Sequence, residues 1–146
     1  MQAWNMMGDD RTIVAGFSLG GGVLGMCYND FYPQPAQLVF INTFSNLRKL
    51  VEDTVPLGLG SWITPFMQTN WITPKPLDPS SFRCRVTVIS TVDDSLMTRS
   101  QTKELRETFS CAKPNWVELE SGGHALSLIQ HLHVVTRPDV VFPCHT

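Results

Sequence analysis

The sequence predicts an α/β protein built around a parallel β-sheet, on two observations. Four short apolar runs, at 12–15, 38–41, 86–89 and 116–119, are rich in β-branched and aromatic residues and have the length of buried strands. Segments with helix-compatible spacing separate most of these runs along the chain. Alternating strands and helices favour one parallel sheet with helices covering both of its faces.

Four segments are expected to form the helices: 19–28, 44–53, 100–109 and about 125–134. The glycines of the first would let it pack closely on the sheet, and Thr43 or Ser45 is the expected cap of the second. The third is rich in good helix formers and ends before Pro114. Together the strands and helices predict a single domain over 1–146.

One segment, 54–81, breaks the alternation. It holds five prolines together with apolar side chains that include Trp62, Phe66 and Trp71. An insertion this apolar and this often interrupted by proline is typical of a cap or lid. We expect Phe17 and these three aromatic side chains to shape an apolar substrate pocket; the alternative is ordinary packing over the sheet.

The composition argues against several classes of partner. The formal net charge is −2, and Lys and Arg are scattered, so nothing favours nucleic acid or an anionic membrane. No run of eighteen apolar residues occurs, so no transmembrane segment is expected. Residues 1–10 lack the basic region and apolar run of a targeting peptide, which favours the cytoplasm.

The cysteines predict neither a disulfide framework nor a metal site. They are far apart and form no C-x-x-C motif, so reduced, buried thiols are expected. The four are Cys27, Cys84, Cys111 and Cys144. No cofactor is expected.

The strongest motif is Gly16-Phe17-Ser18-Leu19-Gly20, between a predicted strand and a predicted helix. In this context G-x-S-x-G forms a nucleophile elbow, which holds its serine in a strained conformation while Gly16 and Gly20 leave room for the turn. The Ser18 hydroxyl would project above the sheet, and the Leu19 N–H could donate to an oxyanion. The alternative is a glycine-rich turn with an incidental serine.

A serine nucleophile needs a base, and His124 is the best placed of the four histidines. It follows the fourth predicted strand in a Ser-Gly-Gly-His turn, at the edge where catalytic groups of open parallel sheets gather. His131 and His133 are two apart on a predicted helix, so they face different directions and cannot form a metal pair. His145 lies in the tail.

The base needs an acid to orient it, and Asp93 and Asp94 both follow the third predicted strand. Neighbouring residues cannot both point at one imidazole. We favour Asp93, with Asp94 as the alternative, because the segment 90–93 resembles the G-x-x-D that ends this strand in hydrolases. Ser90 stands where that pattern has glycine.

The chain order Ser, Asp, His is that of α/β-hydrolases and differs from the chymotrypsin and subtilisin orders. With the elbow motif, it makes nearly the whole sequence resemble the α/β-hydrolase superfamily. The segment 41–47 resembles the N/S-x-F-x-x-I/L segment of its serine-aminopeptidase-like and monoglyceride-lipase-like branches. The resemblance implies a partial α/β-hydrolase fold, whose four strands are the fifth to eighth of an eight-stranded sheet of order 1-2-4-3-5-6-7-8.

The resemblance also implies that the first four strands of the family, and the loop that supplies a second oxyanion N–H, are missing. Losing one such donor typically costs about a hundred- to a thousand-fold in turnover. The strand 12–15 would become an uncovered apolar edge. We therefore expect a truncated chain that needs a missing N-terminal half or a partner chain.

Two functions follow from these observations. The first is a serine hydrolase that cleaves an ester or related acyl bond of a small-molecule or lipid-like substrate through an acyl-enzyme intermediate. The second is an inactive remnant that serves as a binding piece, which the missing half and the bare edge strand favour. Esterases, lipases, peptidases and thioesterases share the same three residues, so the fold does not choose among them.

Overall fold

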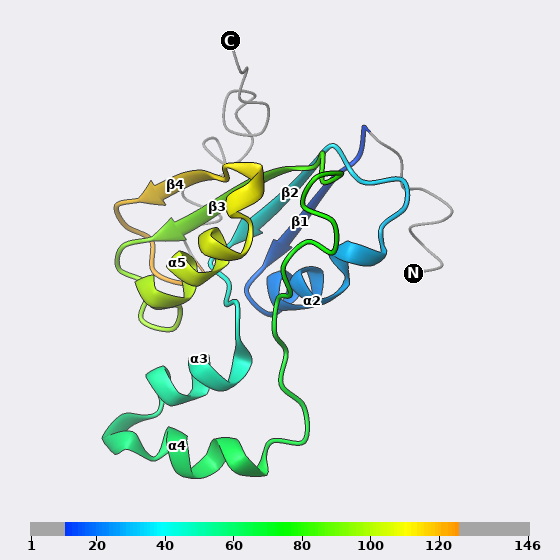
Figure 1. The fold of residues 1–146 in the computed structure, drawn as a ribbon. Helices are drawn as coiled ribbons and strands as arrows, with labels where there is room; N and C mark the ends of the chain where they lie inside the picture. Colours follow the sequence, from blue (N-terminus) through cyan, green and yellow to red (C-terminus); the bar gives the residue numbers. More distant parts are fainter. Residues whose placement is uncertain (1–10, 126–146) are drawn as a thin grey trace.

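Four parallel strands form one sheet in the order β1-β2-β3-β4, as predicted (Figure 1). This arrangement comes from a computed structural model, which describes residues 11–125. The strands are β1 (Ile13–Phe17), β2 (Gln37–Ile41), β3 (Arg85–Thr91) and β4 (Asn115–Leu119). β3 ends at Thr91, two residues beyond its predicted end, so the loop that carries Asp93 and Asp94 begins at residue 92.

Helices α2 (Leu19–Cys27) and α5 (Arg99–Thr108) pack on the same face of the sheet. Their apolar residues, with Tyr28 and Phe109 just beyond the helix ends, join strand side chains such as Phe40 in one buried cluster. Right-handed crossovers in a sheet of this order bring each connecting helix to the same side. The expectation of helices on both faces is therefore wrong for the described residues. The predicted helix at 125–134 lies beyond them, apart from its first residue.

The second predicted helix begins later than expected. Helix α3 (Leu47–Thr54) is capped by Asn46, whose side-chain oxygen accepts a hydrogen bond of 3.2 Å from the Lys49 N–H. Thr43 and Ser45, the two expected caps, use their hydroxyls in tertiary hydrogen bonds instead. Local sequence therefore gave the correct helix but the wrong first residue.

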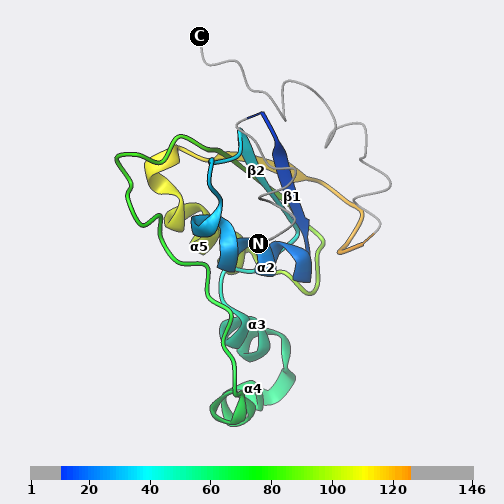
Figure 2. The ribbon, with the colours of Figure 1, turned by 90° about the vertical axis from the view of Figure 1, so that its right-hand side faces the viewer.

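The chain between β2 and β3 leaves the sheet in an excursion that projects beyond the edge where β2 ends (Figures 1 and 2). It comprises α3, α4 (Gly60–Ile63) and the 3-10 turns Pro56–Gly58 and Thr64–Phe66. An antiparallel bridge between Asn46 and Ile72, flanked by backbone hydrogen bonds of 2.9 and 2.8 Å, closes its base. The excursion, taken between the two residues of this bridge, covers 46–72 and overlaps the segment 54–81, whose role as a cap stays a prediction.

Two further 3-10 turns, Tyr28–Asp30 and Ser110–Ala112, follow α2 and α5. Within residues 11–125 no helix is long and apolar enough to cross a membrane. The expectation of buried thiols is right for Cys84. Burial raises the pKa of this thiol to about 12. The expectation is wrong for Cys111, which is exposed, while Cys27 is half-buried and Cys144 lies outside the described residues.

Candidate active site

Ser18 stands at the turn between β1 and α2 in a strained conformation, with φ 51° and ψ −121°. A positive φ is uncommon for a residue other than glycine, and such strain is concentrated at functional sites. The backbone holds the turn in place: the Ser18 N–H donates to the Ile41 carbonyl at 3.0 Å, which extends the pairing of β1 with β2 by one residue. The structure therefore gives the G-x-S-x-G motif its expected strand–turn–helix geometry.

The two glycines of the motif are not equivalent. A Cβ on Gly16 would lie 2.6 Å from the Gly21 Cα, a distance that real side chains do not tolerate. A Cβ on Gly20 would meet nothing within 4 Å. The expected need for glycine thus holds at Gly16 but not at Gly20. Close packing requires it instead at Gly21, where a Cβ would lie 2.5 Å from the Thr43 side chain.

The structure brings His124 to Ser18, although 106 residues separate them in the sequence. The imidazole Nε2 lies 2.7 Å from the Ser18 Oγ, within hydrogen-bonding distance. Its side chain is 17% exposed, and the ring of Phe17 lies beside it at a centroid distance of 5.3 Å. Such a half-buried imidazole is shielded by protein but still open to a small reactant.

The acid that contacts the imidazole is Asp94, which corrects the expectation of Asp93. The Asp94 Oδ2 lies 2.8 Å from the His124 Nδ1, and the carboxylate side chain is completely buried. Its other oxygen accepts hydrogen bonds from the N–H groups of Leu96 and Met97, at 2.8 and 2.9 Å. These backbone donors leave a single direction for the second oxygen, toward the imidazole.

Asp93 bonds to the backbone of the turn that precedes His124. Its two carboxylate oxygens accept hydrogen bonds from the N–H groups of Gly122 and Gly123, at 3.2 and 2.8 Å. Both glycines have positive φ, 123° and 55°, so this turn depends on their conformational freedom. The two adjacent carboxylates after β3 therefore bond to different groups of the histidine loop, Asp93 to its backbone and Asp94 to the imidazole. The one sequence signal that separated them, the G-x-x-D resemblance of the segment 90–93, favoured Asp93, which does not contact the imidazole.

The hydrogen bonds fix the direction of proton transfer. A carboxylate can only accept, so the His124 Nδ1 must carry the proton that faces Asp94. The Nε2 then presents a lone pair to the Ser18 hydroxyl, which lies at hydrogen-bonding distance. This arrangement is chemically competent to remove the hydroxyl proton as the serine attacks a carbonyl carbon.

Leu19 is the first residue of α2, and its N–H has no carbonyl partner within the helix. Leu19 follows Ser18 directly in the chain, and its amide lies at the positive end of the helix dipole, which favours a developing negative charge. The role of this N–H as an oxyanion donor stays a prediction.

The four predicted pocket residues are not gathered around this site. Phe17 lies against His124, whereas Trp62 and Phe66, in the excursion, are 77% and 84% exposed. Trp71 lies at the base of the excursion, where its carbonyl accepts from the Leu47 N–H. Within residues 11–125, Trp62 and Phe66 are therefore open to solvent, and their part in a substrate pocket stays a prediction.

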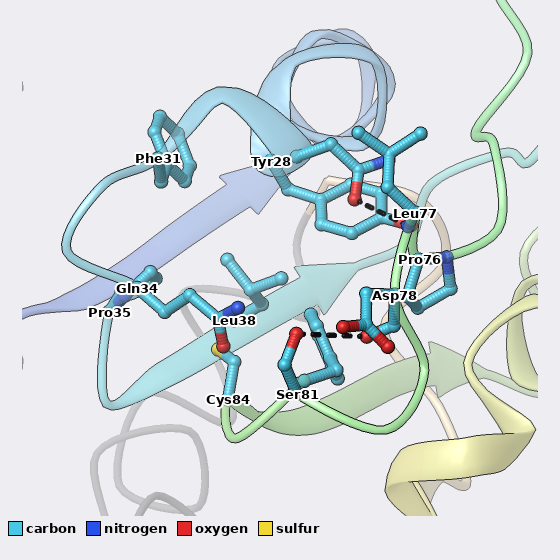
Figure 3. Close-up of a pocket in the computed structure, with 12 residues that line it drawn as sticks. Tyr28, Phe31, Gln34, Pro35, Leu38, Pro76, Leu77, Asp78, Ser81 and Cys84 are labelled. Atoms are coloured by element: carbon cyan, nitrogen blue, oxygen red, sulfur yellow. Dashed lines mark hydrogen bonds between the residues drawn. The ribbon is translucent and has the colours of Figure 1, made fainter.

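A cavity of about 130 Å³ lies at the other edge of the sheet (Figure 3). Leu38, near the start of β2, and Cys84, just before β3, lie on its wall together with Tyr28. Ser18 follows the carboxyl end of β1, so this cavity is separate from the candidate active site. Within residues 11–125 no cluster of His, Cys, Asp or Glu side chains could hold a metal ion.

Two polar residues that follow β2, Asn42 and Thr43, also reach the loops of the site. Sequence analysis did not single them out as site residues. The available signal was their place directly after an apolar strand, at the edge where functional groups of parallel sheets gather.

No family model matches the sequence, and no curated protein matches it. Solved structures do match. An α/β-hydrolase from Vibrio vulnificus aligns at a TM-score of 0.63 and 15% identity, over 90% of this chain and 49% of that chain. An esterase domain from Rhodothermus marinus aligns at 0.58 and 14% identity, over 86% and 56%. A puromycin-hydrolysing peptidase from Mycobacterium tuberculosis aligns at 0.61 and 14% identity, over 97% and 24%.

At these identities the likeness is one of fold. The chain has a partial α/β-hydrolase fold, as the sequence resemblance implied. It spans about half, or less, of the length of these three proteins.

Proposed function

We propose that this chain carries the reacting residues of a serine hydrolase that cleaves an ester or related acyl bond. The observation that carries the proposal is the hydrogen-bonded series Ser18, His124 and Asp94, with contacts of 2.7 and 2.8 Å at one edge of the sheet. That the structures of similar fold include esterases and peptidases supports hydrolysis as the reaction class.

The proposed reaction proceeds in two halves. The Ser18 Oγ attacks the substrate carbonyl carbon while the His124 Nε2 takes its proton, and Asp94 stabilises the imidazolium that forms. The Leu19 N–H donates to the oxyanion of the tetrahedral intermediate. Collapse of this intermediate releases the leaving group, protonated by His124, and leaves an acyl group on Ser18. Water then repeats the sequence and releases the acid.

An apolar acyl substrate is part of the proposal. The excursion, which we propose to act as a cap, exposes Leu57, Trp62 and Phe66, each more than three-quarters accessible. Burying one such side chain against a substrate contributes roughly 1.5–3 kcal/mol. A small-molecule or lipid-like acyl chain offers the apolar surface that these residues lack.

We further propose that additional polypeptide covers β1 and α2. Among the described residues β1 is an edge strand of the sheet, and it is largely apolar. Helix α2 buries one side against the sheet, yet its other side exposes Leu19, Val23 and Met26, at the i, i+4, i+7 spacing of a helix face. A helix with two apolar sides is typical of a buried position. The remainder of a longer protein, or a partner chain, would supply the cover.

A fluorophosphonate probe tests the reaction directly, because it reacts covalently with an activated serine. The full chain should be labelled, and peptide mass mapping should place the label on Ser18. Ser18→Ala should abolish labelling. Ser61→Ala, at an exposed serine of the excursion, is the matched control and should be labelled as fast as the unsubstituted chain. A folded protein whose Ser18 stays unmodified would contradict the proposal and favour a binding role without catalysis.

A further inference from the structure

Two consecutive residues at the end of β2, Asn42 and Thr43, contact both halves of the candidate active site. Both are buried, at 2% and 4% exposure. One side chain bonds to the peptide backbone at the serine and the other to the backbone at the histidine. A buried polar side chain is costly unless its hydrogen bonds are made, so the identity of these bonds indicates what the residues do.

Thr43 holds the nucleophile turn. Its hydroxyl donates to the Ser18 carbonyl at 2.6 Å, a short hydrogen bond. On the other side of the same residue, the Ser18 N–H donates to the Ile41 carbonyl at 3.0 Å. Both backbone polar groups of Ser18 are therefore fixed to the three residues 41–43.

Asn42 holds the histidine loop. Its side-chain amide nitrogen donates to the His124 carbonyl at 3.0 Å and lies 3.4 Å from the Gly123 carbonyl. The same nitrogen lies 3.1 Å from the Thr91 hydroxyl, at the end of β3. Asn42 has φ 42°, which asparagine tolerates better than most residues, and this conformation belongs to the turn between β2 and Thr43.

We propose that Asn42 and Thr43 are positioning residues that set the separation between the Ser18 Oγ and the His124 Nε2. Ser18 follows β1 and His124 follows β4, the two outer strands of the described sheet, so no direct strand pairing fixes one against the other. Adjacent Cα atoms lie about 3.8 Å apart across a trans peptide, so anchors on neighbouring residues cannot drift apart. The pair thus forms a short, stiff connection between nucleophile and base. As a statement about rate, this inference rests on the proposed hydrolase function.

Loss of either anchor should slow the reaction without weakening substrate binding in proportion. A misplacement of reacting groups by about 1 Å can cost roughly a hundred-fold in rate. Asn42→Gly removes the amide and keeps a residue that adopts positive φ freely. Thr43→Val removes the hydroxyl at nearly constant shape, and Thr43→Ser restores the hydroxyl.

The control is Gln37→Met, at the other end of β2. Gln37 is completely buried and donates to the Thr87 hydroxyl at 2.7 Å, so its loss also removes a buried polar contact. Asn42 lies five positions further along the chain, roughly 16 Å away at the rise of a strand. A loss of stability without a positioning effect should appear in this variant alone.

The experiment measures two quantities on each folded, full-length variant. The first is the rate of Ser18 labelling by a fluorophosphonate, together with kcat and KM for p-nitrophenyl acetate. The second is the tautomer of the His124 ring, from the ¹⁵N NMR shifts of its two nitrogens, which needs no activity. We expect Asn42→Gly and Thr43→Val to lower the labelling rate and kcat about a hundred-fold with little change in KM. Thr43→Ser and Gln37→Met should keep the rate of the unsubstituted chain.

The NMR measurement separates this inference from the hydrolase proposal. Asn42→Gly should convert the single Nδ1–H tautomer of the folded chain into a mixture, because the ring no longer keeps its two partners. If the unsubstituted chain is not labelled, the hydrolase proposal fails, and the tautomer alone decides the positioning role. An unchanged tautomer in Asn42→Gly, or an unchanged labelling rate in a chain that is labelled, overturns it.

Discussion

Replacing each of the two adjacent aspartates by asparagine separates the acid that orients the imidazole from the one that holds its loop. In Asp94→Asn, the side-chain oxygen can keep the hydrogen bonds from Leu96 and Met97, so the loop should still fold. The amide NH₂ then faces the His124 Nδ1 as a donor and forces that nitrogen to accept. The ring proton moves to Nε2, where it faces the Ser18 oxygen and abolishes the base.

The expected loss follows from this change of tautomer. The equivalent substitution in a serine protease lowers turnover by about 10⁴-fold, which corresponds to roughly 5 kcal/mol of transition-state stabilisation. Asp93→Asn keeps one acceptor oxygen for the N–H groups of Gly122 and Gly123 and loses the other at an exposed position. The loss of one such hydrogen bond costs about 1 kcal/mol, or about five-fold. The two variants should therefore differ by about a thousand-fold.

The assay is the fluorophosphonate labelling rate of Ser18, measured at one pH and normalised to the folded fraction of each variant. Thermal unfolding of both variants provides the control for stability. Equal rates in the two variants, or a slower rate in Asp93→Asn, would refute the assignment of Asp94 as the orienting acid.

Two further predictions concern stability. Gly22→Ala should lower the free energy of unfolding by about 1–3 kcal/mol, because its Cβ would lie 2.4 Å from the Phe44 ring. Gly20→Ala, whose Cβ meets nothing within 4 Å, should leave the free energy of unfolding unchanged or raise it by up to ~1 kcal/mol. Urea unfolding measures both. The Lys49–Glu104 ion pair, about a third exposed, should contribute about 0.2–1 kcal/mol at neutral pH. Burial opposes ionisation of Glu104, but the hydrogen bonds from Lys49 and Ser45 outweigh burial and lower the pKa of Glu104 below 4.5. The hydrogen bond to Glu104 raises the pKa of Lys49 above 10.5. The ion pair therefore contributes to stability between these two pKa values. Its contribution is lost as pH falls through the folded-state pKa of Glu104, and also as pH rises through that of Lys49. Lys49→Met should therefore lower the thermal midpoint at pH 7 but not at pH 2.

The sequence predicted those parts of the site whose geometry is local. A strand, a turn with glycine two residues before the serine, and a helix together determine where the Ser18 hydroxyl lies. His124 was predictable for a related reason, because a glycine-containing turn after a strand opens at the edge where Ser18 lies. In both cases residues next to the functional side chain define its surroundings.

The choice between Asp93 and Asp94 could not be made in this way. Adjacent residues of the same type differ only in which partners the folded loops offer them, here the N–H groups at 96–97 and those at 122–123. The prediction of the first residue of α3 was wrong for the same reason. The Thr43 hydroxyl satisfied both a helix-capping pattern and a distant carbonyl, and the tertiary hydrogen bond was the one formed.

Residues 11–125 form part of an α/β-hydrolase fold. They hold a hydrogen-bonded serine, histidine and aspartate, and they also expose apolar side chains on α2 and on the excursion. The proton-transfer contacts depend on β1 to β4 and on the turn after β2, all within residues 11–125. The exposed apolar faces belong to α2, for which we proposed a cover of additional polypeptide, and to the excursion, which we proposed to act as a cap. Supplying that cover should therefore act mainly on substrate affinity and on the oxyanion, and much less on the ability of His124 to take the Ser18 proton.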